Sequence, residues 1–496
     1  MGRPPFPFQG ETTPTIFERS RPGRHGTTVP EADVPEVPLD ELVPAAHRRA
    51  EAPRLPEAPE HVVVRHYTEL SLKNHHVDRA LYPLGSCTMK YNPKVNEQTA
   101  RLPGFAELHP FTPHRAAQGA LELMYELAGI LKEIAGMDAV SLQPAAGAQG
   151  EMTGVLLMRA YHRARGDEGR KRVLIPDSAH GTNPATVALA GFDCVELPSD
   201  EQGRVDLDAV RGALGDDLAG MMLTNPNTLG VFESQIEEIS RLVHESGGLM
   251  YMDGANLNAL MGIVRPGDMG YDIVHFNLHK TFSTPHGGGG PGAGPVAVKE
   301  PLARFLPVPH IEQEDGDFVM AWDRPDSIGK IHGFYGNFGV MVRAYTYIRM
   351  LGAVGIRRTA EAAVLNNAYL SARLSDTYPL PYGRGLHESV FTGEELKREH
   401  GVRTTDVAKR LLDYGFHAPT IYFPLTVPEA LMTEPTETET REELDRYVDS
   451  LEAIAREAAE DPDLVRTAPH ETPVRRLDEG KAGRELDVRW GFPEEG

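Results

Sequence analysis

The sequence predicts an α/β fold with a mostly parallel sheet, followed by a smaller domain. Between about His75 and Phe334, short apolar runs that suit buried strands alternate with segments of helical apolar spacing. This order is typical of strand–helix–strand units. Several of the apolar runs end in small or polar residues. Because ligands collect beyond the carboxyl ends of parallel strands, we expect a binding site at these turns.

Composition and charge narrow the class of protein. A chain of 496 residues is long enough for two or three domains around a large core. The net charge of −22 argues against nucleic acids and anionic membranes as main partners, because both attract basic surfaces. No apolar stretch approaches the roughly 20 residues needed to span a bilayer, and the N-terminus lacks a signal-peptide pattern. We therefore expect a cytoplasmic protein.

The chain divides into three predicted parts. Residues 1–75 begin with a segment rich in proline and charge and are expected to form an extended N-terminal arm. Residues 76–335 hold the alternating pattern and form the predicted large domain. Residues 336–496 begin with a long helical run that is interrupted near Gly352 to Gly355. This helix leads into a predicted small α+β domain with a charged tail. Its expected strands are ESVFT and TIYFPL, and its expected helices are DVAKRLLDYG and REELDRYVDSLEAIAREAAE. The block EPTETE before the second helix suits a helix-capping turn, with Thr438 or Thr440 as the cap.

Two strand ends carry a lysine and an aspartate. The run DIVHFN leads to Lys280, which has His279 and His286 near it and a glycine-rich stretch after it, and the run LMYMD ends at Asp253. A lysine can form a Schiff base, and an aspartate can keep a pyridinium nitrogen protonated. Together they indicate a pyridoxal phosphate site. Taken singly, Lys280 also suits a solvated loop and Asp253 a turn cap.

Three further turns suit the same cofactor. Ala146, Gly147 and Ala148 precede a helical run, where backbone N–H groups can approach a phosphate. His180 follows a buried strand and can lie on the cofactor ring, and Thr228 lies in a polar turn that can reach the ring hydroxyl. Each has a structural alternative, namely an ordinary strand-to-helix turn, a core or capping histidine, and a plain turn residue.

The two cysteines predict neither a disulfide nor a metal site. Cys87 and Cys194 are far apart in the sequence, which suits a reducing compartment, and neither has the spacing partners of a zinc site. Cys87 lies in GSCTMK and could exchange with a disulfide substrate, but we favour a packed loop near the active site. Thiol reactivity requires an environment that lowers the thiol pKa.

Longer sequence blocks resemble a known family. The blocks are LGSCTMKYNP, QPAAGAQGE, SAHGTNPA, DGAN, NLHKTFSTPHGGGGPG, DVAKRLLDYGFHAPT and EPTETE. They resemble glycine dehydrogenase (decarboxylating), the P-protein of the glycine cleavage system, from about His66 to Glu460. That family includes a split form with two homologous subunits, and this chain resembles the second, which carries the cofactor lysine. The resemblance implies a fold type I pyridoxal phosphate enzyme, with a seven-stranded-type sheet covered by helices on both faces.

The resemblance implies roles for the matched positions. Lys280 would form the Schiff base with pyridoxal 5'-phosphate, and Asp253 would pair with the pyridinium nitrogen. The other matched positions would surround the cofactor: Ala255 beside Asp253, His180 stacked on the ring, Thr228 near the hydroxyl, and His279 with the turn Ala146, Gly147 and Ala148 at the phosphate. One position departs from the pattern, since Ala146 stands where some members have a hydroxyl residue. Backbone groups or another side chain would have to replace that donor.

The resemblance also implies an activity and partners. The enzyme would be an oxidoreductase that decarboxylates glycine, releases carbon dioxide and transfers the aminomethyl group to the oxidised lipoyl-lysine of H-protein. Lys280 and His180 would be the candidate acid–base groups. The implied partners are glycine dehydrogenase subunit 1, with two copies of each subunit, and lipoylated H-protein. Two alternatives stay open, another fold type I enzyme such as an amino-acid decarboxylase, and a structural subunit of a complex.

Overall fold

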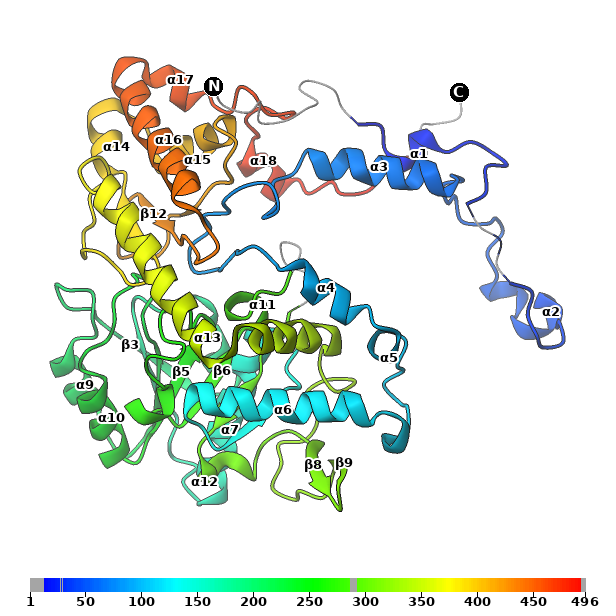
Figure 1. Cartoon of the computed structure of the whole chain (residues 1–496), viewed down its shortest axis with the longest axis horizontal. Coiled ribbons are helices and arrows are strands. Elements are labelled where there is room, and N and C mark those ends of the chain that lie inside the picture. The colour runs from blue at the N-terminus through cyan, green and yellow to red at the C-terminus, as the bar shows by residue number, and fades with distance from the viewer. Residues whose placement is uncertain (1–12, 27, 29, 286–291, 492–496) are drawn as a thin grey trace.

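The largest unit of the molecule is a seven-stranded sheet of order β1-β7-β6-β5-β4-β2-β3 (Figure 1). The computed structural model describes residues 13–26, 28, 30–285 and 292–491. Strands β2 to β6 run parallel, whereas β7 runs antiparallel to both of its neighbours. The strands are β1 (Ala139–Ser141), β2 (Arg172–Pro176), β3 (Asp193–Leu197), β4 (Leu218–Thr224), β5 (Leu249–Gly254), β6 (Ile273–Phe276) and β7 (Val296–Val298). The predicted mostly parallel sheet is confirmed.

Helices cover both faces of this sheet. Side chains alternate along each strand, so in β5 Met250 and Met252 face one core while Tyr251 faces the other. The first core is covered by α6 (Gln118–Ala135), α10 (Ile236–Glu245) and α13 (Phe338–Leu374), and the second by α7 (Gly147–Ala164), α8 (Thr182–Leu189) and α12 (Glu300–Ala303). A sheet buried on both faces explains the continuous apolar runs in the sequence.

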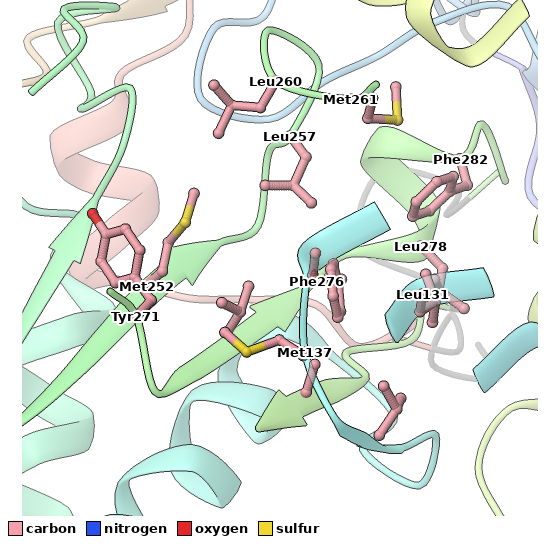
Figure 2. Close-up of a cluster of buried hydrophobic side chains, with 14 of the residues drawn as sticks. Leu131, Met137, Met252, Leu257, Leu260, Met261, Tyr271, Phe276, Leu278 and Phe282 are labelled. Carbon is pink, nitrogen blue, oxygen red and sulfur yellow. The ribbon is translucent and has the colours of Figure 1, made fainter. Parts of the chain in front are cut away.

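Figure 2 shows part of the first core, where Leu131 of α6 lies near Phe276 of β6 and Leu278, which follows that strand. Helix α6 presents Leu123, Leu127 and Leu131 at a spacing of four residues, and all three are buried. The helix ends at Ala135, and the residue after it, Gly136, has a left-handed φ of 66°, a conformation that favours glycine at a helix C-terminus.

Helix α13 is interrupted at Gly352, within the stretch where the sequence predicts a break. Its backbone angles, φ 62° and ψ −179°, are not helical, and the helix resumes on the far side. These angles belong to a region that is essentially restricted to glycine. A single glycine therefore joins the half of the helix that packs on the large sheet to the half that leads to the small domain.

We expect Gly352→Ala to lower the free energy of unfolding by about 1–3 kcal/mol, the cost of this backbone conformation for a residue with a Cβ. No atom lies within 4 Å of the position a Cβ would take, so the loss would come from the backbone alone. Urea denaturation followed by circular dichroism measures it. Gly129→Ala in α6, where space is also open, is the control and should raise stability, because alanine favours a helix over glycine by about 1 kcal/mol.

The small domain is built on a three-stranded antiparallel sheet of order β10-β12-β11. Its strands are β10 (Ser389–Thr392), β11 (Thr420–Ile421) and β12 (Ala430–Thr433), and its helices are α14 (Glu394–His400), α15 (Thr404–Asp413), α16 (Arg441–Glu460) and α17 (Pro462–Arg466). The sequence indicated β10, β11, α15 and α16 but not β12. Thr440 caps α16, with its side chain accepting a hydrogen bond from the N–H of Glu443 at 3.3 Å, as one of the two expected caps.

The described residues of the N-terminal segment include three α-helices where the sequence predicts an extended arm. They are α1 (Ile16–Arg19), α2 (Leu39–Leu42) and α3 (Glu60–Leu72). In Figure 1 they lie away from the large sheet, and Leu39 and Leu42 are exposed. Phe17 stacks on Trp490 of the C-terminal tail, with 5.7 Å between ring centroids. The second aromatic residue of that tail, Phe492, lies outside the described residues.

The remaining elements are short. They are α4 (Lys94–Ala100), α5 (Pro103–Ala106), α9 (Leu207–Ala213), α11 (Leu278–Thr281), α18 (Glu479–Arg484) and the hairpin of β8 (His310–Glu314) and β9 (Asp317–Ala321), with 3-10 turns at Ala45–His47, His114–Ala116 and Pro266–Met269. In the described part of the chain, none of the helices has the length and apolar character needed to cross a membrane.

Candidate active site

Lys280 lies at the carboxyl end of the parallel sheet. Strand β6 ends at Phe276, and the chain turns at once into the short helix α11 that carries the lysine. The Nζ of Lys280 donates a hydrogen bond to the carbonyl oxygen of Ser86, 2.9 Å away. Both residues line a cavity of about 180 Å³. The lysine is half-buried and thus points into a cavity and not into a solvated loop.

Asp253 closes another side of the same cavity. It stands near the end of β5, beside His275 of β6, whose Nε2 is 3.3 Å from its Oδ1. Asn183 donates to its Oδ2 at 2.9 Å, and the N–H of Ala255 donates to its Oδ1 at 3.0 Å. Burial raises the pKa of Asp253, but His275 and Asn183 more than offset this effect and hold the pKa below its ordinary value. The site therefore keeps a buried carboxylate.

The turn before α7 brings backbone donors to the cavity. Ala146 is the N-cap of this 18-residue helix, and Gly147 and Ala148 line the cavity. A Cβ on Gly147 would lie 2.5 Å from Oδ1 of Asn277, so glycine is needed for this close approach. That buried oxygen has no hydrogen-bond partner among the described residues. The helix N-terminus suits an anionic group, and the amide oxygen of Asn277 suits a hydrogen-bond donor.

His180, Thr228 and Ala255 also line this cavity. His180 is exposed, and its Nδ1 forms a hydrogen bond with Oγ1 of Thr182 at 2.8 Å. Its ring packs edge-on against Phe423, with 5.7 Å between the ring centroids. Thr228 is buried and donates to the carbonyl oxygen of Ser178. The structure thus brings together the predicted residues Lys280, Asp253, His180, Thr228, Ala255, Gly147 and Ala148. The hydroxyl proton of Thr228 is already donated to the backbone, so this hydroxyl can only accept a hydrogen bond from a ligand.

His279 does not line the cavity that holds Lys280. It lines a second cavity of about 380 Å³ together with His75 and Lys90, and its Nδ1 accepts from the N–H of Ala293 at 3.4 Å. Successive residues of a helix point in directions about 100° apart, so the helix α11 separates His279 from its neighbour. His286, the other histidine near the lysine in sequence, lies outside the described residues.

Three acid–base groups of the site were not anticipated from the sequence. His387 and Glu388 line the Lys280 cavity just before β10, and Glu434 lies against them. All three are buried. The EPTETE block was interpreted as a helix-capping turn, a role that Thr440 fills, but its first residue faces inward. A charged residue directly before a short strand, as in HESVF, is the signal that could have identified Glu388.

Cys87 lies close to Lys280, yet its thiol is not activated. Burial raises the pKa of the Cys87 thiol, and this effect outweighs the nearby lysine. A thiol with a raised pKa is a poor nucleophile at neutral pH. The environment therefore supports a packed loop and not a disulfide-exchanging cysteine.

Comparison with solved structures defines the class of fold. The chain matches a crystal structure of glycine decarboxylase (P-protein) of the glycine cleavage system in inhibitor-bound form, with a TM-score of 0.71 and 22% identity over 84% of this chain and 94% of that one. It matches a sphingosine-1-phosphate lyase of Burkholderia pseudomallei with a TM-score of 0.62 and 16% identity, over the same shares of both chains. The fold is that of the fold type I pyridoxal phosphate enzymes, as the sequence resemblance implied.

Sequence comparison defines the family. The family model described as glycine cleavage system P-protein matches residues 34–313, and the model described as glycine dehydrogenase, C-terminal domain, matches residues 359–471. Probable glycine dehydrogenase (decarboxylating) subunit 2 of Caldanaerobacter subterraneus is 59% identical over 477 residues, covering 96% of this chain and 98% of the relative. The relative of the same description from Chlorobium chlorochromatii is 58% identical over 476 residues, covering 96% and 99%. This chain belongs to the glycine cleavage system P-protein family.

Proposed function

We propose that this chain is the cofactor-carrying subunit of a glycine decarboxylase. It binds pyridoxal 5'-phosphate through Lys280, removes the carboxyl group of glycine as carbon dioxide, and passes the aminomethyl group to the lipoyl-lysine of H-protein. The observation that carries this proposal is the placement of Lys280, Asp253 and the N-terminal turn of α7 around one cavity. The family membership identifies the reaction, and this geometry supplies the groups it needs.

The residues of the cavity divide the work of holding the cofactor. Pyridoxal phosphate supplies an electron sink for the carbon that loses its carboxyl group. Asp253, held as a carboxylate, would pair with the ring nitrogen and keep a proton there. The N–H groups of Gly147 and Ala148 would bind the phosphate, and His180 would lie against the ring. Lys280 would attach the cofactor and, once its amine is released, would hold or move a proton at Nζ.

The proposed partners follow from the relatives. Their descriptions as subunit 2 imply a companion subunit, and we propose that this chain pairs with a subunit 1, in two copies of each, and acts on lipoylated H-protein in the cytoplasm. We also propose the division of the chain into an arm (1–75), a large cofactor domain (76–335) and a linker helix with the small domain (336–496). His279 and Ala146 remain candidates for contact with the phosphate.

The decisive test is the absorbance spectrum of the purified chain with pyridoxal phosphate. We expect a visible band from the lysine-bound cofactor, borohydride trapping of the label on the Lys280 peptide, and loss of both in Lys280→Ala. Lys132→Ala, in the last turn of α6, is the control and should keep the band. A band that survives in Lys280→Ala, or a label on another lysine, would disprove the assignment. Release of carbon dioxide from glycine in the presence of subunit 1 and H-protein then tests the reaction.

A further inference from the structure

A second buried cluster stands against Lys280 and has no role in the function proposed above. His387, Glu388 and Glu434 each bring a potential ligand atom within 4.8 Å of the others, and their residues are only 2%, 3% and 1% exposed. His387 and Glu388 line the cavity that holds Lys280. Buried charged groups are costly unless they are paired or hydrogen-bonded. The cluster therefore calls for an explanation.

One hydrogen-bonded chain links the cluster to the lysine through Ser86. The N–H of Ser86 donates to Oε2 of Glu388 at 2.6 Å, and the carbonyl oxygen of Ser86 accepts from Nζ of Lys280 at 2.9 Å. Ser86 has a φ of 59°, a left-handed conformation that is uncommon for a residue other than glycine. The Glu388 carboxyl thus stabilises the unfavourable backbone conformation of Ser86. The carbonyl oxygen of the same residue accepts the hydrogen bond from the Lys280 amine.

The small domain holds the residues on either side of this turn. Leu84 forms an antiparallel bridge with Thr433 at the end of β12. The carbonyl oxygen of Gly85 accepts from Oγ1 of Thr420 at 2.7 Å, and a Cβ on Gly85 would lie 2.2 Å from Cγ of Met432. The segment is therefore packed closely against the small sheet, and the Glu388 carboxyl aligns its last peptide group with the lysine.

The hydrogen bonds of the cluster are compatible with one additional proton, carried by one of its carboxyl groups. Oε1 of Glu434 accepts from Thr88, Asn256 and Asn258, donors that suit a carboxylate. Its Oε2 and both ring nitrogens of His387 have no hydrogen-bond partner among the described residues. These two residues and Lys280 are the titratable groups that face Glu388 in the cluster. A protonated Glu388 could donate to one of the unpartnered atoms while still accepting from Ser86.

The electrostatic environment favours that proton on Glu388. Burial raises the pKa of Glu388 well above its ordinary range, and the adjacent Glu434 raises it further. Burial lowers the pKa of His387, so the imidazole is neutral at neutral pH and does not take the proton. Two carboxyl groups this close share a site where only one ionises readily.

We propose that Glu388 is a positioning residue for Lys280, held as a neutral carboxylic acid that fixes the Ser86 turn. Its carbonyl oxygen accepts from the N–H of Ser86, and the carbonyl group of Ser86 then holds the lysine amine in the cavity. The contacts between Glu388, Ser86 and Lys280 are observed in the structure. Their purpose, which is to keep the amine directed at the cofactor before attachment and after release, rests on the proposed function.

The test measures how readily Lys280 reacts with a trace of acetic anhydride in the full chain stripped of cofactor, by mass spectrometry relative to Lys132. In Glu388→Ala the Ser86 turn is no longer fixed, so its carbonyl oxygen no longer holds the amine of Lys280. We expect labelling of Lys280 to rise about three- to tenfold, the factor that corresponds to one hydrogen bond. In Glu388→Gln the amide still accepts from Ser86 and is uncharged like the acid. Its labelling should stay within about twofold of wild type, below the effect of one hydrogen bond.

Glu439→Gln is the matched control. Burial also raises the pKa of Glu439, to about 7, but this residue does not line the cavity, so labelling of Lys280 should not change. If Glu388→Ala does not fold, Glu388→Leu, which keeps more of the volume, replaces it. Wild-type labelling in the Ala or Leu variant would refute positioning, and faster labelling in Glu388→Gln would refute the neutral acid, because removing an anion would leave more of the amine unprotonated.

The absorbance band of the lysine-bound cofactor separates this inference from the proposed function. If the band is absent in wild type while Lys280 labelling still depends on Glu388 as expected, the proposed cofactor role fails and the positioning of the lysine stands. If the band forms normally while labelling ignores Glu388, the cofactor role stands and the positioning fails.

Discussion

Lys90→Met is expected to lower the free energy of unfolding by about 3–5 kcal/mol, the cost of leaving one charge of a buried ion pair without its partner. The Nζ of Lys90 lies 2.9 Å from Oε1 of Glu437, and the two side chains are 1% and 7% exposed. The same Nζ donates to Oδ1 of Asn258 and to the carbonyl oxygen of Thr281, each at 3.0 Å. Methionine fills the volume but satisfies none of these acceptors.

Urea denaturation followed by circular dichroism measures this loss, and Lys94→Met provides the control. Lys94 pairs with Asp78 on the surface, where the side chains are 55% and 42% exposed, and such pairs contribute about 0–1 kcal/mol. The two substitutions are identical and lie four positions apart. A Lys90 variant no less stable than the Lys94 variant would show that water or a rearrangement compensates Glu437.

The Lys90–Glu437 pair shows where sequence reasoning stopped. Both residues stand in blocks that resemble the family, GSCTMK and EPTETE, but 347 positions separate them. Apolar periodicity indicates which side of one element is buried and carries no information about which two loops meet. The acidic block was therefore interpreted as a helix cap only. The inward-facing Glu434 and Glu437 became visible once the fold placed that loop over the carboxyl end of the sheet.

Four strands of the large sheet were predictable because each is a mainly apolar run. β2, β4, β5 and β6 are buried on both faces, and each ends in a recognisable turn, so the positions of Asp253 and Lys280 at the sheet edge followed from local signals. The strand β12 was missed because its four residues, ALMT, are too few to show a period. The family resemblance implied that His279 lies near the phosphate, and this stays a prediction. The structure shows only that His279 lines a different cavity from Lys280.

Asp253→Asn is expected to slow glycine decarboxylation by about ten- to a thousandfold, because a nearby opposite charge shifts a proton equilibrium by about 1–3 pKa units. In the proposed site the negative charge of the carboxylate stabilises a proton on the ring nitrogen. Asparagine is neutral and cannot provide this stabilisation. The pKa of Asp253 is held below its ordinary value of 3.8. The wild-type carboxylate therefore persists through the neutral and mildly acidic range, and the defect of the variant should be present throughout that range.

Two measurements distinguish loss of the carboxylate from general damage to the sheet. The visible band should persist in Asp253→Asn, because the proposed attachment to Lys280 does not need the carboxylate, while release of carbon dioxide from glycine should fall. Asp272→Asn is the control. This residue lies just before β6, at the opposite end of the neighbouring strand, where it accepts from the N–H of Met250 at 2.7 Å and bonds His244 Nε2 at 2.8 Å. Its loss should affect stability more than rate. Because Asp253 also pairs with the buried His275, a rate close to wild type in Asp253→Asn would mean that the carboxylate serves the imidazole and not the cofactor ring.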